Sequence, residues 1–271
     1  MPPSVRHAGK PASAHLPPPK APPCGGRKPV FDTIMEWTDN GIVLSARAYG
    51  ETGIIADLLT REHGRHSGLV RGNKARALLQ PGNGLSATWR ARLSEQLGNY
   101  TVELARARAG ALMESRDSLI GLNAFCAVAG SALPEHQPHP PLHNVAEILL
   151  DAMMEEDFAH WGPLYVRWEA GLLDALGFGL DLSECAATGA RADLIYVSPR
   201  TGRAVSQSAG LEYAARLLPL PAFLLTDAEA PDLAATRAGL KLTGYFLLER
   251  VLAPHGREMP QARLRLDALA A

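Results

Sequence analysis

The stretch Gly41–Gly64, GIVLSARAYGETGIIADLLTREHG, decides the fold of the N-terminal half of the chain. Its first part, IVLSAR at residues 42–47, alternates with a period of two, which is typical of a β-strand. A second apolar run, Ile54–Thr60, follows and ends at the turn His63-Gly64. Because β-branched residues are frequent and no 3.6-residue repeat persists, the stretch predicts two strands and not a helix.

Three more short runs with strand character lie C-terminal to this stretch. They are Leu69-Val70, which lies between two glycines, then Ala87–Leu93, which alternates again, and Tyr100–Ala105. Five short strands with glycine punctuation predict a small closed or partly closed barrel. We place this domain at residues 35–111 and expect an OB-type β-barrel.

After Ala111 the apolar period becomes helical, which predicts a mainly α-helical domain at 112–271 and therefore an α+β protein. A Pro/His loop, Pro134–Pro141, separates the first two helices, and Gly177 has the character of a helix C-cap. An irregular insertion at 183–210 predicts a hairpin with arms Leu194–Val197 and Arg203–Val205. Helical spacing returns at Leu211–Leu218 and Leu233–Leu252. Three apolar helix faces are expected: Leu119, Leu122, Phe125 and Ala129; Val145, Ile148, Leu149 and Ala152; and Leu164, Trp168, Leu172 and Leu176.

Length and composition exclude several classes of protein. The chain has 271 residues, 46% of them hydrophobic and 20% charged, which fits two globular domains. The most apolar stretch, Leu217–Leu225, is broken by prolines, so no membrane helix is expected. Three cysteines fit a reducing, cytoplasmic compartment. Residues 1–34 contain nine prolines and predict a disordered tail, either a start-site overcall or a weakly anion-binding arm, without the apolar core of a secretory signal.

The net charge of −1 hides a strong asymmetry along the chain. Residues 116–235 carry six basic and sixteen acidic side chains, a net charge of −10. The segment Arg61–Arg92 carries seven basic residues against Glu62, a net charge of +6. Charge runs are usually solvated faces, but this contrast also fits one surface that faces a polyanion and another with a different role.

Signals of an enzyme are weak. No Walker A, GxGxxG, GxSxG or HExxH pattern is present. His136, His139 and His143 have ligand-like spacing, but we expect a solvated loop because the segment is proline-rich and lacks nearby cysteines. Cys126 lies near an apolar helix face and is interpreted as a core thiol. We therefore expect no catalytic residues, and a hydrolase with an unrecognised site has no residue set to support it.

Cys185 begins a turn-rich insertion of the kind that often holds structural zinc. Thr188 stands three residues later where a second cysteine would be needed, and Ser206 and Ser208 stand where another pair would follow. Hydroxyls cannot replace thiolates in a four-coordinate zinc site without losing most of the affinity. The sequence therefore predicts no metal and no cofactor, with the insertion held by packing and hydrogen bonds.

The basic segment gains meaning when it is placed on the barrel. Its cations lie near predicted strand ends and on one strand face, so they would form a charged groove. OB-type barrels bind oligonucleotides on such a face, and few aromatic residues here favour backbone-dominated, sequence-independent binding. The predicted DNA-binding residues are Arg65, Arg71, Lys74, Arg76, Arg90 and Arg92.

Several segments resemble the RecO recombination-mediator family of DNA repair proteins. They match in the same order from about Met35 to the C-terminus: Gly41–Thr52, Leu59–Arg65, Leu79–Pro81, Leu133–His139 and Trp168–Phe178 with Leu182 and Cys185. The resemblance implies an OB-fold, a helical domain and a zinc-ribbon-like insertion, degenerate here. It also implies single- and double-stranded DNA binding and strand annealing, with RecR, the single-strand-binding protein SSB and RecA as surrounding machinery, in the cytoplasm and on the nucleoid.

Individual residues follow from the same resemblance. Arg65, Arg71, Lys74 and Arg76 carry over as phosphate contacts, although the basic segment after Gly72 is shorter than is usual in the family. Arg167-Trp168 resembles the segment that captures the acidic, aromatic-ended tail of SSB, although Trp168 also fits the helix core. The chain is expected to be a monomer and not an enzyme.

A rival interpretation comes from another class of protein. In it the chain is a protein-interaction scaffold whose barrel binds an acidic peptide in place of DNA. Competition between an oligonucleotide and such a peptide would separate the two interpretations.

Overall fold

The structure is a computed structural model that describes residues 1, 35–72, 75–93, 96–226 and 231–270. Residues 2–34 of the tail expected at 1–34, and the predicted DNA contact Lys74, lie outside the described residues. Among the described helices, none is both long and apolar enough to cross a membrane.

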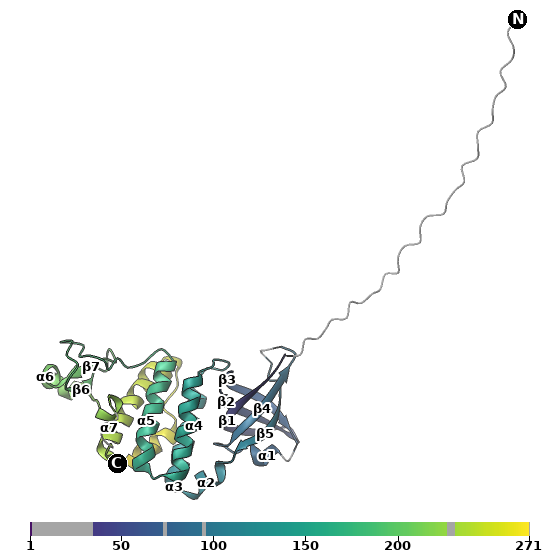
Figure 1. Ribbon diagram of the computed structural model, residues 1–271, viewed down its shortest axis with the longest axis horizontal. Helices are drawn as coiled ribbons and strands as arrows, with labels where there is room; N and C mark the ends of the chain where they lie inside the picture. Colours follow the sequence, from purple (N-terminus) through teal and green to yellow (C-terminus); the bar gives the residue numbers. More distant parts are fainter. Residues whose placement is uncertain (2–34, 73–74, 94–95, 227–230, 271) are drawn as a thin grey trace. The chain divides into compact units, whose positions relative to one another are not determined.

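Five strands form a closed barrel in the order β1-β2-β3-β5-β4 (Figure 1). β1 pairs antiparallel with both β2 and β4, and β3 closes the barrel through a short parallel pairing with β5. A short helix, α1 (Ala75–Leu78), connects β3 to β4. The barrel confirms the predicted OB-type fold. The strands are β1 (Met35–Tyr49), β2 (Gly53–Thr60), β3 (Gly64–Arg71), β4 (Gly84–Ala91) and β5 (Asn99–Arg106).

The central part of β1 is buried on both of its faces. Val43 belongs to the core inside the barrel, together with Leu58 of β2. Ile42 and Leu59, which point to the opposite side, belong to the core shared with the helices. The run IVL at residues 42–44 is therefore uniformly apolar because the helices cover the outside of the barrel at this point.

The second half of the chain is mainly helical, as predicted. α4 packs against α5, and α3 contacts α8; Figure 1 shows α4 and α5 side by side. Beyond α7 the chain continues as a π-helix at Leu247–Leu252. The α-helices are α2 (Ala109–Glu114), α3 (Arg116–Ala132), α4 (Pro140–Glu155), α5 (Phe158–Ala175), α6 (Gln207–Gly210), α7 (Leu233–Phe246) and α8 (Gln261–Asp267).

Leu119, which belongs to the first predicted helix face, is exposed on α3. The second predicted face is wrong. Val145 and Ile148 of α4 are exposed, and its buried side instead includes His143, Ala146 and Leu150. His143 therefore lies in the core and not in the solvated loop expected for the histidines at 136–143. The buried side of α4 differs from the predicted one because the side of α4 toward the barrel carries carboxylates that are paired with arginines.

The predicted hairpin is present in the insertion. β6 (Leu194–Val197) pairs with β7 (Ala204–Ser206), and β8 (Leu218–Pro219) adds a third strand on the other side of β6. The hairpin confirms the pairing expected around residues 199–202. β8 lies beyond the predicted limit of the insertion at residue 210.

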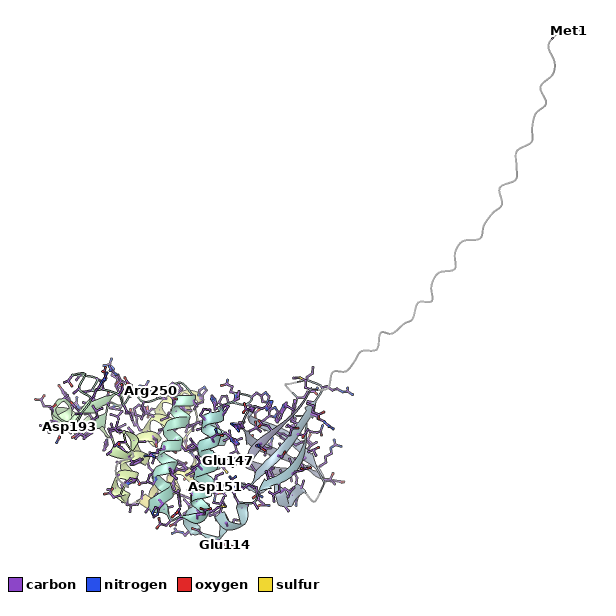
Figure 2. The ribbon with its side chains drawn as sticks, viewed as in Figure 1. Met1, Glu114, Glu147, Asp151, Asp193 and Arg250 are labelled. Carbon is purple, nitrogen blue, oxygen red and sulfur yellow. The ribbon has the colours of Figure 1, made fainter. Side chains whose placement is uncertain are left out.

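Arginines from the barrel meet carboxylates on α4. Glu147 and Asp151 lie on the side of α4 toward the barrel (Figure 2). Arg108, whose side chain is fully buried, donates to Asp151 Oδ1 at 2.7 Å and to Glu147, and Arg106 donates to Asp151 Oδ2 at 2.9 Å. Two acidic charges of the helical part are thus neutralised within the protein.

Gly64 marks a second close contact between the barrel and the helical part. Its φ of 71° lies in the left-handed region, and a Cβ here would overlap the main chain of Gln137. His136 donates its backbone N–H to the Arg65 carbonyl oxygen at 2.9 Å. Only glycine therefore allows the β2–β3 turn to approach the loop after α3.

Candidate nucleic-acid interface

Exposed arginines lie near one another at one end of the barrel. Asn99, the first residue of β5, pairs with Leu69 on one side and with Arg90 on the other. Arg90 therefore lies across the start of β5 from the end of β3, which carries Arg71. Arg92 follows β4 by one residue and is also exposed. We call Arg71, Arg76, Arg90 and Arg92 the rim arginines.

A groove opens beside Arg71. It has a volume of about 550 Å³, and its walls come from the end of β3, from α1 and from the start of β5. Arg76 is exposed on α1, which contacts β5. Most of the described residues that line the groove are apolar, and Arg71 is the one cation among them. It is lined by Leu69, Val70, Arg71, Gly72, Ala75, Leu78, Asn99, Tyr100, Thr101 and Val102.

Arg90 is paired within the barrel. Its Nε lies 2.8 Å from Glu36 Oε2, in the neighbouring strand β1. The hydrogen bond that the guanidinium donates to this carboxylate, together with the carboxylate charge, raises the pKa of Arg90. Both side chains are about half exposed, so the pair competes with water and is weak. A phosphate can replace Glu36 as the partner of Arg90 at little cost.

Arg65 has a different setting from the rim arginines, and the expected phosphate contact does not fit it. Its side chain is only 17% exposed and lies against the helical part. Its guanidinium donates to the carbonyl oxygens of Gly130 and Leu133 and pairs with Asp57 and Glu135. With its donors directed to protein groups, Arg65 joins the barrel to α3, and we leave it out of the DNA surface.

Arg167 and Trp168, the expected partner-binding pair, lie in different environments. Trp168 is fully buried and packs on Phe125, with ring centroids 4.7 Å apart, so its side chain cannot contact a partner directly. Arg167 donates to the Phe223 carbonyl oxygen at 2.8 Å and lies over the Phe223 ring. It lines a cavity of about 340 Å³ with Phe223, Leu224 and Leu225. Of this pair, Arg167 alone is placed beside a cavity.

Sequence reasoning missed an aromatic cluster in the barrel. Trp37 on β1 stacks against Trp89 inside the barrel and against His63 on its other face. His66 contacts Trp37 and Trp89 edge-on and stacks on His136. The available signal was the N-terminal part of β1, which begins at Met35 and so precedes the stretch Gly41–Gly64 in which the strand was expected. Trp89 is buried, whereas Arg90, which points to the other side of β4, is exposed.

Cys185 is held by hydrogen bonds in a tight turn. The Ser206 backbone N–H donates to its Sγ at 3.2 Å, and the Gly189 N–H returns to the Cys185 carbonyl oxygen. Burial raises the pKa of the thiol, but hydrogen bonds from the hydroxyls of Ser206 and Thr188 and from the backbone N–H groups of Ser206 and Ala187 together lower the pKa to about 6. Two of the positions that would hold zinc thiolates, Thr188 and Ser206, thus lie at the Cys185 sulfur. Among the described residues, no group of three histidine, cysteine or acidic side chains is arranged to hold a metal.

Cys126 occupies a different environment from Cys185. It packs against the helical core, and burial raises the pKa of its thiol to about 12. A thiol with so high a pKa is a poor nucleophile, which agrees with its interpretation as a core residue.

A closed five-stranded barrel with a cationic rim, followed by a helical half, defines an OB-fold protein with an attached helical domain. Residues 35–108 match the family model for the recombination protein O N-terminal domain, and residues 113–258 match that for its C-terminal domain. The chain belongs to the RecO family. It is 52% identical to the DNA repair protein RecO of Rhodospirillum rubrum over 86% of this chain and 95% of that protein. It is 49% identical to the DNA repair protein RecO of Ruegeria sp. over 87% of this chain and 99% of that protein. It is 48% identical to the DNA repair protein RecO of Methylorubrum extorquens over 87% of this chain and 98% of that protein.

Proposed function

We propose that the protein is a non-enzymatic recombination mediator in DNA repair. Its barrel binds single- and double-stranded DNA through phosphates, anneals SSB-coated strands and, with RecR, helps to load RecA. The rim arginines around the groove at one end of the barrel carry this proposal. The relatives named DNA repair protein RecO support the same role.

The physical argument is electrostatic. Guanidinium groups on a barrel rim neutralise phosphates without reading bases, so binding is independent of sequence. The acidic helical half repels DNA, which leaves its surface for protein partners. Paired carboxylates such as Glu147 and Asp151 do not compete for the rim because they are bound to Arg108 and Arg106.

A salt titration with a fluorescent single-stranded oligonucleotide tests DNA binding. If the four rim arginines contact phosphates, log K should fall against log[salt] with a slope of about −3. Arg71→Ala and Arg76→Ala should each weaken binding evenly across sequences and reduce the slope by about 0.7. Arg216→Ala removes the same charge from the helical half and should change neither the DNA affinity nor the salt slope. A slope near zero for the unmodified protein would remove DNA from its function.

The cavity at Arg167 is the proposed receptor for the SSB tail. A cation beside apolar walls fits a peptide that combines acidic residues with a terminal aromatic ring and carboxylate. Arg167→Ala should weaken binding of a synthetic acidic, aromatic-ended peptide and leave oligonucleotide affinity unchanged. If that peptide instead displaced the oligonucleotide from the barrel, the scaffold interpretation would replace the mediator.

A further inference from the structure

Three aromatic rings form a column from the barrel core toward the surface. Trp89 is buried at the inner end, and its ring centroid lies 5.6 Å from that of Trp37 at an interplanar angle of 18°. Trp37 in turn stacks on His63, with centroids 4.0 Å apart and planes 6° apart. The column ends at His63, whose side chain is 34% exposed.

His63 is held in this orientation by a buried carboxylate. Its Nδ1 lies 3.0 Å from Asp39 Oδ2, and the Asp39 side chain is only 6% exposed. Asp39 also accepts the backbone N–H groups of Asn40 and Glu62. A carboxylate fixed by two backbone donors cannot follow the imidazole outward, so the ring is pre-oriented at the β2–β3 turn.

Two sides of the His63 ring are covered, and its side chain is 34% exposed. Trp37 covers one face of the ring, and Asp39 covers the Nδ1 edge. Among the residues that the structure describes, Trp37 is the only ring in contact with His63. The remaining face is therefore a flat aromatic surface open to a further ring.

Cationic and amide groups lie close to His63 and Asp39 along the chain. Arg61, two residues before His63, has a side chain that is 49% exposed and paired with the exposed Glu62, a weak pair. Asn40 and Arg61 also line a cleft of about 310 Å³ between the barrel and α4, which Arg106 borders. A ring platform with arginines beside it has the groups that a base and its phosphate require.

We propose that His63 is a stacking site for one unpaired nucleobase of single-stranded DNA, with Arg61 contacting a neighbouring phosphate. The site rests on the proposed DNA-binding function and adds a strand preference to it. Bases in a duplex are covered on both faces, so only a single strand can supply the ring. The eight residues of β3 separate this site from Arg71 by about 25 Å, so it is distinct from the rim.

The stack also belongs to the packing of the barrel core, so the test must separate stacking from folding. His63→Ala removes the ring, His63→Phe keeps a ring without the Asp39 bond, and Arg216→Ala serves as the surface control. Three fluorescent probes are compared: a (dT)12 single strand, a 12-base-pair duplex, and an abasic 12-mer that retains the phosphates. Urea unfolding of each variant checks that the fold is intact.

His63→Ala should weaken (dT)12 binding by about tenfold and leave duplex and abasic binding within twofold of the unmodified protein. His63→Phe should restore (dT)12 affinity, because stacking needs the ring and not the imidazole nitrogens. Equal losses on all three probes, or no loss on any, would overturn the stacking site. Absence of binding by all probes to the unmodified protein would instead refute the proposed function.

A crosslinking experiment does not depend on the variants folding. A single strand that contains 5-iododeoxyuridine is irradiated with the unmodified full-length chain, and the attached peptide is mapped. Attachment at His63 supports the site. Attachment confined to the rim arginines, or to the cavity at Arg167, would overturn the stacking site at His63 but would still support DNA binding by the protein.

Discussion

Arg65 donates a hydrogen bond to the main-chain oxygen of Leu133, the residue that ends α3, over an Nη1–O distance of 2.8 Å. The same Nη1 donates to the Gly130 carbonyl oxygen at 2.6 Å. The last carbonyls of a helix have no partner within the helix and carry its negative dipole end. An arginine from β3 therefore satisfies the end of α3 and attaches the barrel to the helical half.

Arg65→Ala should reduce the free energy of unfolding by about 2–3 kcal/mol, because it leaves two carbonyl oxygens without a donor and Asp57 without its guanidinium. Burial already raises the pKa of Asp57, and Arg65 opposes that rise. Urea unfolding measures the loss, and Arg47→Ala, an exposed arginine on β1, is the control with little expected change. Unchanged stability together with weaker DNA binding would show that Arg65 contacts phosphate after all.

The buried ion pair between α5 and α8 gives a second prediction. Arg263 Nε lies 2.5 Å from Glu169 Oε1, Arg263 Nη2 lies 3.0 Å from Oε2, and both side chains are inaccessible to solvent. Arg263→Met leaves the Glu169 charge buried and should cost about 3–5 kcal/mol of unfolding free energy. The double variant with Glu169→Leu should be more stable than Arg263→Met alone. A double variant less stable than Arg263→Met would show that Glu169 stabilises the fold even without its arginine partner, which contradicts this prediction.

Acid should destabilise the barrel through His66. Burial, together with the charge of His136, lowers the pKa of His66 to about 4, from an ordinary value of 6.5. Between these values the unfolded chain binds a proton that the folded chain does not, so stability falls as the pH drops from about 6.5 to 4. The loss from this group is at most about 3 kcal/mol.

Urea midpoints at pH 7, 5.5 and 4.5 measure this dependence. His66→Phe keeps a ring of similar size and removes the titrating group, so its stability should fall less steeply over the same interval. Equal slopes for the two proteins would place the acid sensitivity in other groups.

The strands of the barrel were predictable because period-two alternation is a local property of the sequence. Along β4, for example, Trp89 is buried and the next residue, Arg90, is exposed. The role of Arg65 was not predictable in this way, because its carbonyl partners lie 65 and 68 residues further along the chain.

The face of α4 and the aromatic column were missed for related reasons. The side of α4 toward the barrel is polar in sequence, and it lies against the barrel only because Arg106 and Arg108 pair with Glu147 and Asp151. The column brings together residues of β1, β4 and the β2–β3 turn, which only the barrel register aligns. Long-range pairing, not local propensity, decided these features.

The insertion gives a final prediction about metal. Cys185 is the sole thiol in its turn, with the hydroxyls of Thr188 and Ser206 on its sulfur, so the purified protein should hold no stoichiometric zinc. A chelator should leave its melting temperature unchanged. Thr188→Cys combined with Ser206→Cys places three thiolates around the same point and should bind Co²⁺ with thiolate absorption, because three protein ligands and a water complete a tetrahedral site. Zinc in the unmodified protein whose removal lowers the melting temperature would refute the hydrogen-bonded turn.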